Sequence, residues 1–510
     1  MDSILLLLPN QLFKKHEYKN IYLWTHPKFF TDLKFHKNKL VLHYATIYAY
    51  VDKFKVKLID NLNKIKTKVN LSTKVNLSTK VIKKLIIYDP TDFEIQEEIE
   101  KFCKKNKIEL EILQSKLFLL TTNELDEYSK IKSKDSKIKN KASKIKNKAY
   151  FNHSFYIWVR NKTGILMKNG KPLGGSYSYD TENRLPFKSN YKEGKIKTYS
   201  NKYIKKAIKI VEEEYSNNPG EILSVIPVTH AEALKHFKKF LKEKLNDFGP
   251  YEDAFRKDVE IGFHSNISAL LNIGLLDVKE VIKLTLDYYT SHKSVKIQSV
   301  EGFLRQIISW REYVRMLYLY EHETFNKMNF FKHHRKINQN WFNGSTMIKP
   351  VDDVINKINK LGYAHHIERL MILSNFALLT EIEPKEIYKW FLSFVSIDAY
   401  EWVMEPNVYG MGIHSVGQLM MNRPYFSSSN YLYKMNPELK KDKSDKIKLG
   451  EEEYDWDEIW DALYYNFIDS NKDYLKKIYS TATSVAHLKK KSLNEINKIK
   501  KIANLYMKKY

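Results

Sequence analysis

Two adjacent histidines, His365 and His366, stand just before Arg369 in the sequence. Residues three apart on a helix share a face, so His366 and Arg369 would project in the same direction. A histidine whose pKa is near neutrality can give and take back a proton, which is the chemistry of a general acid and base. The alternative is structural: one histidine caps a backbone carbonyl and the other lies in the core.

Two serines, Ser265 and Ser268, precede an apolar stretch that predicts a helix. Hydroxyl groups and the free backbone amides of a helix N-terminus can together hold a diphosphate. Arg311 would add charge-assisted hydrogen bonds to such an anion. A serine before a helix is more often only an N-cap, so the prediction of an anion site depends on the combination.

The 510-residue chain is strongly basic, with 86 Lys and Arg against 60 Asp and Glu and a net charge of +26. This excess favours a polyanionic partner, because each cation placed on a phosphate releases counterions. The alternative is a lysine-rich bias in which the lysines form solvated surface. Cys103 is the only cysteine, which excludes an intrachain disulfide and indicates a reducing compartment.

No segment of the sequence is typical of a membrane protein or a secreted one. The first residues lack a basic region before the short apolar run Ile4–Leu8, and no later run reaches the ~18 apolar residues that a membrane span needs. We therefore expect a soluble intracellular protein without a membrane partner, in the cytoplasm or the nucleus, and a monomer.

Short apolar runs separated by helical spacing fill the first 122 residues, and they predict an α/β fold with a doubly wound parallel sheet. Ligands of such sheets bind beyond the carboxyl ends of the strands, so the turn Pro9-Asn10-Gln11 faces a predicted pocket. The expected strands are Ile4–Leu8, Ile21–Trp24, Leu40–His43, Leu85–Tyr88, Leu110–Leu113 and Leu117–Leu120, with a helix over Phe93–Lys105.

The sequence contains two low-complexity inserts. Residues 68–79 repeat KVNLST, and residues 129–149 are three lysine-rich heptads with too few apolar side chains for a coiled coil. We interpret the heptads as a solvated linker, with an accessory phosphate-binding arm as the alternative. From about Tyr203 the pattern is helical, so we divide the chain into an α/β domain (1–128), the linker (129–149), a connector (150–230) and an all-α domain (231–510).

Several motifs resemble the photolyase/cryptochrome superfamily. Three stretches of this chain are similar to the flavin-entry motifs of that superfamily: Phe248–Ala254, Phe263–Gly274 and Gly302–Tyr313. Further stretches resemble the bacterial (6-4) photolyases, also called iron–sulfur bacterial cryptochromes and photolyases. These stretches are Thr163–Met167, Gly174-Gly175, Tyr179–Arg184, Pro227–Ala233, Tyr363–Met371, Asp398–Trp402, Pro406-Asn407 and Pro424-Tyr425. The resemblance covers residues 151–470 well and residues 1–120 only in pattern.

The resemblance implies an N-terminal antenna domain and a C-terminal FAD-binding catalytic domain. It implies an ion pair between Arg369 and Asp398 beside the flavin ring, which would stabilise a reduced, anionic flavin. It also implies a lumazine-type antenna chromophore. The residues expected to bind FAD are His264, Ser265, Asn266, Ile267, Ser268, Arg311, Arg369, Asp398, Tyr400, Met404 and Asn407.

The remaining implied roles concern the lesion, the electron relay and a metal. His365 and His366 would project into the lesion cavity, Gln306 would contact flipped-out bases, and Tyr425 would stack or offer its hydroxyl. Trp390 and Trp341 would relay electrons. Asp180 and Asp253 match the carboxylates expected to bind Mg²⁺, although such residues are more often helix caps or arginine partners.

The sequence departs from the family at four places. A [4Fe–4S] cluster needs about four thiolates, so with Cys103 alone we expect no cluster. Met404 stands where the family has a polar residue facing flavin N5, and a thioether is only a weak acceptor. Phe391 and Phe342 stand where the family has redox-active aromatic residues, and Asn10 stands where it usually has Asp.

The sequence therefore predicts a light-driven, FAD-dependent photolyase that repairs UV-damaged DNA, most readily (6-4) photoproducts. Three alternatives stay open. The enzyme could repair cyclobutane dimers, it could be a cryptochrome-like light sensor without repair, as Met404 and the altered relay suggest, or it could be a light-independent nucleic-acid-binding scaffold.

Overall fold

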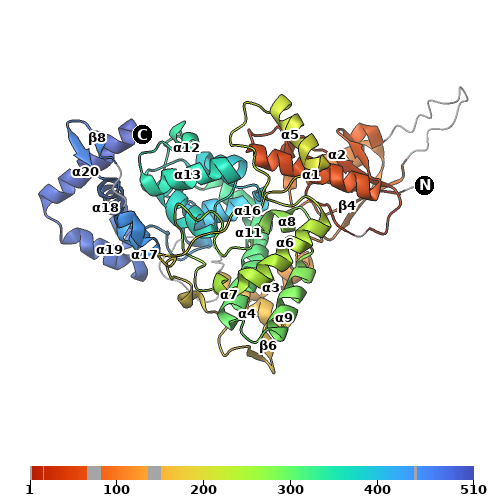
Figure 1. The fold of residues 1–510 in the computed structure, drawn as a ribbon, viewed down its shortest axis with the longest axis horizontal. Helices are drawn as coiled ribbons and strands as arrows, with labels where there is room; N and C mark the ends of the chain where they lie inside the picture. The colour runs from red at the N-terminus through yellow and green to blue at the C-terminus, as the bar shows by residue number, and fades with distance from the viewer. Residues whose placement is uncertain (1–2, 15, 66–81, 136–150, 442–444) are drawn as a thin grey trace, which may run out of the picture. The chain divides into compact units, whose positions relative to one another are not determined.

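The computed structural model describes residues 3–14, 16–65, 82–135, 151–441 and 445–510 (Figure 1). The 68–79 repeat and residues 136–149 of the expected linker lie outside this range, while residues 129–135 continue helix α3 (Thr122–Asp135). The chain forms two compact units, each built from three separate segments. The first contains Met1–Glu127, Ile196–Glu243 and Ser265–His292, and the second contains Tyr128–Lys195, Lys244–His264 and Lys293–Tyr510.

The first unit contains the expected parallel sheet. Its five strands lie in the order β3-β2-β1-β4-β5, with every neighbouring pair parallel. The central strand β1 is almost wholly buried, as its uninterrupted apolar sequence predicts for a sheet covered on both faces. The strands are β1 (Ser3–Leu7), β2 (Ile21–Trp24), β3 (Lys57–Ile59), β4 (Lys84–Tyr88) and β5 (Glu109–Leu113).

Two of the expected strands of this unit are wrong. Leu40–His43 lies inside helix α1 (Lys37–Phe54), and Leu117–Leu120 is an irregular turn segment. Helix α1 begins where the His36 imidazole accepts a hydrogen bond from the Asn38 amide, and it lies along α5 (Lys202–Glu214) in Figure 1. The other helices of the unit are α2 (Phe93–Asn106), the start of α3, α6 (His230–Glu243), α8 (Ser268–Asn272) and α9 (Val278–Ser291), with short turns η1 (Pro27–Phe29) and η2 (Leu62–Ile65).

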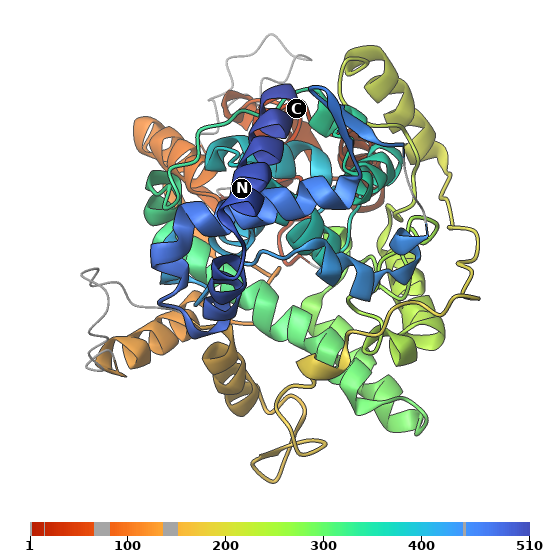
Figure 2. The same ribbon diagram turned by 90° about the vertical axis from the view of Figure 1, so that its left-hand side faces the viewer.

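The second unit is largely helical, as the 3.6-residue pattern predicts. Its C-terminal helices α18, α19 and α20, dark blue in Figure 2, pack against one another. Its helices are α4 (Asn152–Thr163), α7 (Leu245–Phe248), α10 (Ile297–Arg305), α11 (Arg311–Lys327), α12 (Asn340–Asn343), α13 (Lys349–Leu361), α14 (Asn375–Leu379), α15 (Pro384–Trp390), α16 (Glu401–Met404), α17 (Ser429–Met435), α18 (Trp456–Leu475), α19 (Tyr479–Lys489) and α20 (Leu493–Lys509).

Short elements complete this unit. Two hairpins pair β6 (Met167–Lys168) with β7 (Lys171–Pro172) and β8 (Ile447–Leu449) with β9 (Glu452–Tyr454), and 3₁₀ turns occur at η3 (Asp180–Glu182), η8 (Gly417–Leu419) and η9 (Pro437–Lys440). Helix α4 falls within the connector that we expected to lack periodic structure, because Phe155, Tyr156 and Val159 give it a buried face. No helix among the described residues is long and apolar enough to cross a membrane.

Four π-helical segments interrupt the helices of the second unit: η4 (Gln306–Trp310), η5 (Glu368–Ser374), η6 (Phe391–Val395) and η7 (Glu405–Gly412). A π segment adds a residue to a helical turn and re-aims the side chains around it, and such segments are frequent at functional sites. Gln306, Arg369 and Asn407, all predicted site residues, lie on three of them.

Candidate functional site

The Arg369–Asp398 ion pair that we expected is present in the second unit. The two terminal nitrogens of the Arg369 guanidinium lie 3.1 and 3.3 Å from the two carboxylate oxygens of Asp398. The guanidinium also donates to the carbonyl of Ala364 at 2.6 Å and to the hydroxyl of Ser396 at 2.8 Å. Four bonds in one plane fix both side chains, so the pair is preorganised.

The residues after Asp398 form a short, buried helical stretch. Tyr400 and Met404 are buried, and burial raises the pKa of Tyr400, so its phenol stays protonated. Asn407, on η7, donates its amide to the carbonyl of Val403 at 2.7 Å, which leaves its amide oxygen turned away from that helix. These residues occupy one continuous segment, as the predicted flavin-binding set requires.

Arg311 begins α11, with its guanidinium carbon 5.0 Å from the centre of the Trp402 ring. Burial lowers the pKa of Arg311 to about 10, a shift that Glu312 only partly offsets. A buried cation of this kind is stabilised by an anion that comes to lie beside it. The role of Arg311 toward a diphosphate stays a prediction.

His365, one of the two predicted catalytic histidines, lies in the protein interior. Its ring stacks on His264 with a centroid distance of 4.6 Å and an interplanar angle of 16°. Its Nε2 lies 3.6 Å from Glu368, whose carboxylate forms a buried ion pair with Lys357. Burial holds the pKa of both stacked histidines well below the usual value, so both rings are neutral.

Each of these two rings keeps one buried nitrogen without a hydrogen-bond partner among the described residues, Nε2 of His264 and Nδ1 of His365. Buried polar atoms are rarely left unsatisfied in folded proteins, so these two nitrogens indicate room for a further polar group. A bound cofactor at the predicted flavin site would supply such a group. The residues present therefore fit FAD.

His366 differs from its neighbour because its side chain is exposed. Surrounding protein nevertheless desolvates it and lowers its pKa to about 4, with Arg369 and Arg305 lowering the value further and Asp180 raising it. His366 is therefore the histidine of the pair whose side chain remains accessible, within the electrostatic influence of Arg369.

Gln306 and Tyr425 lie close to the same charged groups. Gln306 donates its amide to Glu252 at 2.7 Å, and Glu252 feels the charges of Arg305 and Asp180. Burial raises the pKa of Tyr425, and Asp180 raises it as well. Gln306 thus contacts this charged group directly, His366 and Tyr425 feel the charge of Asp180, and His365 is buried.

This charged cluster has Arg305 at its centre, and we name it the Arg305 cluster. The guanidinium lies 2.9 Å from Asp180, 3.1 Å from Glu301 and 3.8 Å from Glu252. Burial raises the pKa of Glu252 to about 8 and that of the adjacent Asp253 to about 7. One buried cation therefore faces more carboxyl groups than it can neutralise, and some of these groups hold protons near neutral pH.

The two predicted magnesium ligands each lie next to an arginine side chain. Asp180 pairs with Arg305, and Asp253 lies 4.0 Å from Arg184. In the part of the chain that the structure describes, no group of three or more His, Cys, Asp or Glu side chains is arranged to hold a metal ion. The arginine-partner alternative accounts for both aspartates, and the geometry adds no support for Mg²⁺.

The remaining predicted FAD residues belong to the first unit. Ser265 accepts a hydrogen bond from His236 at 3.0 Å through its carbonyl, and Asn266 has a positive φ of 51°, a conformation that side chains other than Gly and Asn seldom adopt. Ile267 is buried, and α8 begins at Ser268 as the sequence predicts. The diphosphate role of these residues stays a prediction.

The predicted relay residues Trp341 and Trp390 are adjacent and buried. Their rings lie 5.3 Å apart at 85°, and the Trp390 indole donates to the carbonyl of Trp341 at 3.1 Å. Phe391 packs on Trp390 at 5.4 Å. The two tryptophans are close enough for electron exchange, and Phe391 occupies the position next to Trp390.

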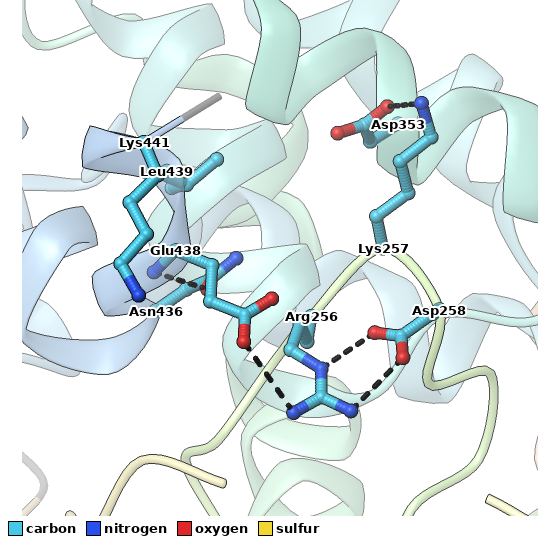
Figure 3. Close-up of a pocket in the computed structure, with 8 residues that line it drawn as sticks. All are labelled: Arg256, Lys257, Asp258, Asp353, Asn436, Glu438, Leu439 and Lys441. Atoms are coloured by element: carbon cyan, nitrogen blue, oxygen red, sulfur yellow. Dashed lines mark hydrogen bonds and ion pairs between the residues drawn. The ribbon is translucent and has the colours of Figure 1, made fainter. Parts of the chain in front are cut away.

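The second unit has a hollow with a volume of about 510 Å³, which is drawn in Figure 3. Its charged groups mostly neutralise one another: Arg256 pairs with Asp258 and Glu438, and Lys257 pairs with Asp353. Arg256 also donates to two backbone carbonyls. Because these donors are already engaged, we assign this hollow to the packing of the loop around η9.

Sequence reasoning missed Glu252 and Arg305. Both were within reach, since Glu252 precedes Asp253 in the quoted Phe248–Ala254 motif and Arg305 precedes Gln306 in the next one. The signal was the adjacent acidic pair Glu252-Asp253 in one motif and Arg305 directly before Gln306 in another. Only the fold shows that these motifs meet.

Comparisons with known proteins agree with this geometry. Residues 5–225 match the family described as deoxyribodipyrimidine photo-lyase-related protein. The chain is 31% identical over 406 residues to a (6-4) photolyase of Agrobacterium fabrum, covering 79% of this chain and 76% of that protein.

Solved structures share the fold. A Synechocystis sp. PCC6803 cryptochrome aligns with a TM-score of 0.52 and 12% identity, covering 86% of this chain and 89% of that one. A bacterial class III photolyase from Agrobacterium tumefaciens aligns with a TM-score of 0.51 and 14% identity, covering 86% and 87%. Together with the sequence relative, they show that the chain belongs to the photolyase/cryptochrome superfamily, in the group of photolyase-related proteins that includes the bacterial (6-4) photolyases.

Proposed function

We propose that this protein is a light-driven, FAD-dependent DNA photolyase that repairs (6-4) photoproducts. The observation that carries the proposal is His366, an exposed imidazole within the electrostatic influence of Arg369, Asp180 and Arg305. A (6-4) lesion needs more than bond cleavage, because an OH or NH2 group must return to its original base. A positioned imidazole meets that need by moving a proton.

FAD would be held by the predicted residues, with the Arg369–Asp398 pair at its ring and Arg311 near its phosphates. When bound and reduced, FAD supplies the light-driven electron for the lesion. His366 holds and moves the proton at its ring nitrogens, Gln306 contacts the extruded base, and Tyr425 stacks or donates its hydroxyl. Trp341 and Trp390 carry electrons inward when the flavin has to be reduced.

The first unit is proposed to hold a lumazine-type antenna chromophore. Asn10 follows the end of β1, is buried, and its side-chain oxygen has no hydrogen-bond partner among the described residues. Its neighbour Gln11 donates to the carbonyls of Tyr88 and Asp89 at 3.2 Å and so joins the ends of β1 and β4. The carboxyl end of a parallel sheet is where such folds bind ligands.

The experiment that tests the function starts with the absorption spectrum and the released chromophores of the purified protein, which we expect to contain FAD and no iron. Chemically reduced protein is then illuminated with duplexes that carry a single (6-4) photoproduct or a single cyclobutane dimer. We expect repair of the (6-4) lesion. Repair of the cyclobutane dimer alone would make the enzyme the other kind of photolyase, and absence of FAD would reject both.

One observation favours a second candidate, a cryptochrome-like light sensor. Met404 is buried at the position expected to face the flavin, and Phe391 follows Trp390 in the relay. Both features affect how the flavin is reduced by light and not how a lesion is handled. Prereduced protein that binds damaged DNA and still fails to repair either lesion would favour the sensor.

DNA binding is expected to be salt-sensitive and to prefer damaged duplex. The preference arises because an extruded lesion is buried, and the salt dependence arises because the chain carries a net charge of +26. Fluorescence anisotropy across a salt series should give a linear fall of log affinity against log salt for both duplexes, with tighter binding to the damaged one throughout. Equal affinity for damaged and intact duplex at moderate salt contradicts the repair role.

A further inference from the structure

One side chain of the connector, Glu193, binds three consecutive backbone amides of the turn 260–262. Oε2 of Glu193 accepts from the amide of Glu260 at 2.6 Å, and Oε1 accepts from the amide of Gly262 at 2.7 Å. The amide of Ile261 donates to both oxygens at 3.2 Å. Successive amides that converge in this way form an anion-binding nest. The Glu193 side chain is only 10% exposed, so these amides take the place of most of the water around its charge.

Two carbonyl groups of the same turn are engaged as well. The ammonium group of Lys244 donates to the carbonyl of Gly262 at 2.6 Å and lies 3.9 Å from Oε1 of Glu193. The carbonyl of Ile261 accepts the backbone N–H of His264 at 3.3 Å. Two opposite charges therefore fix the turn, and the backbone of His264 is hydrogen-bonded to it.

The connector around Glu193 is held on this turn by other contacts too. Gly262 has a positive φ of 59°, and a Cβ at this position would lie 2.9 Å from the Phe187 ring, so glycine lets the ring pack closely. The Arg256 guanidinium donates to two backbone carbonyls of the connector between Phe187 and Glu193. A change confined to the Glu193 carboxylate therefore leaves the connector in place.

From this geometry we infer that Glu193 is a positioning residue for the cofactor, which fixes the turn before His264 and so holds the His264 ring ready to contact FAD. The inference deepens the proposed function and rests on it. His264 belongs to the predicted FAD-binding set, and its ring stacks on His365. Its buried Nε2 has no hydrogen-bond partner among the described residues. A backbone that is already fixed lowers the cost of ordering that binding of FAD would otherwise carry.

Glu193→Gln tests this role. The carboxylate offers an acceptor oxygen to each end of the turn, whereas an amide offers one oxygen and turns an NH2 group toward the other donor. One end of the turn therefore loses its partner. The matched control is Glu260→Gln, which removes a charge of the same type from the same turn, because the Glu260 side chain binds Lys360 and its backbone amide is unchanged.

The experiment follows release of FAD from the full chain in the dark by the fluorescence of the free flavin, together with amide hydrogen exchange of residues 260–262. Glu193→Gln should release FAD about 10-fold faster, the lower range for loss of a hydrogen bond to a charged group. Its turn amides should also exchange faster, because their protection depends on the carboxylate. Glu260→Gln should match the parent in both measurements.

His264→Ala separates positioning from a general loosening of the fold. If Glu193 acts through His264, His264→Ala should itself speed the release of FAD, and adding Glu193→Gln should change the rate no further. A Glu193 with a merely structural role would instead lower the melting temperature and add its full effect to that of His264→Ala.

The possible outcomes distinguish this inference from the proposed function. Release of FAD at the parental rate by Glu193→Gln, or an undiminished effect beside His264→Ala, overturns the positioning role, and the photolyase proposal stands. If Glu193→Gln does not fold, Lys244→Met takes its place, because it removes the donor on the Gly262 carbonyl and should speed release in the same way. A parent protein without FAD overturns both.

Discussion

Replacing His366 with alanine is expected to slow repair of a (6-4) lesion by about 100-fold, the lower range for loss of a general acid or base. The protein should keep its FAD and its affinity for the lesion, because the His366 side chain is exposed. Single-turnover repair by prereduced protein under constant illumination measures the effect directly. Repair at the parental rate would return the histidine pair to a structural role.

The pH dependence of the same reaction gives an independent test. Since the pKa of His366 is lowered to about 4, its ring is neutral at pH 7 and can accept a proton, whereas the donor form becomes common only as the pH falls. Repair limited by proton donation should therefore quicken at lower pH. His366→Ala should lose this dependence.

His365→Ala is the matched control for His366→Ala. His365 is buried against His264 and next to Glu368, so its removal leaves a cavity and a lower melting temperature. Repair should decline less than in His366→Ala once the protein is folded. An equal or greater loss of repair in folded His365→Ala would exchange the roles of the two histidines.

Glu368→Ala is expected to reduce the free energy of unfolding by about 3–5 kcal/mol, the usual cost of breaking a buried ion pair from one side. Both Lys357 and Glu368 are buried, and the carboxylate also accepts the backbone N–H of His365 at 3.0 Å. Removing the carboxylate leaves the ammonium group in the core without its partner. Chemical denaturation of the parent and variant measures the difference.

The double variant Lys357→Met, Glu368→Gln separates the ion pair from general packing loss. It removes both charges and keeps most of the volume, so it should be destabilised much less than the sum of the single changes. Additive losses would mean that the two side chains contribute independently and that the interaction between them is weak.

The parts of the fold that depend on local sequence pattern could be predicted from the sequence. The buried runs of β1 and β4 predicted a parallel sheet, and Phe93–Lys105 became helix α2. Leu40–His43 was wrongly predicted as a strand because α1 is buried on most of its faces. A short apolar run looks the same in a buried helix and in a buried strand. Strand β3 was missed because two of its three residues are exposed.

The site was predictable where the resemblance named both partners of an interaction. The Arg369–Asp398 pair could be expected from a resemblance, and the structure places it as expected. The different environments of His365 and His366 could not be predicted, because His365 ends an irregular stretch, His366 begins a helical turn and the chain is π-helical from Glu368. A period of 3.6 residues therefore does not set their directions. The Arg305 cluster joins three segments that only tertiary contacts bring together.

The discontinuous first unit has a consequence for synthesis. Its sheet is complete by residue 113, but α5 on α1 and the hydrogen bond from the Leu12 amide to the carbonyl of Ile273 belong to later segments (Figure 1). While a ribosome is still translating those segments, the apolar faces of the sheet and of α1 lack part of their cover. Such partly covered intermediates are the aggregation-prone ones in multidomain chains. We therefore expect the nascent protein to be most prone to aggregation until Ser265–His292 has emerged.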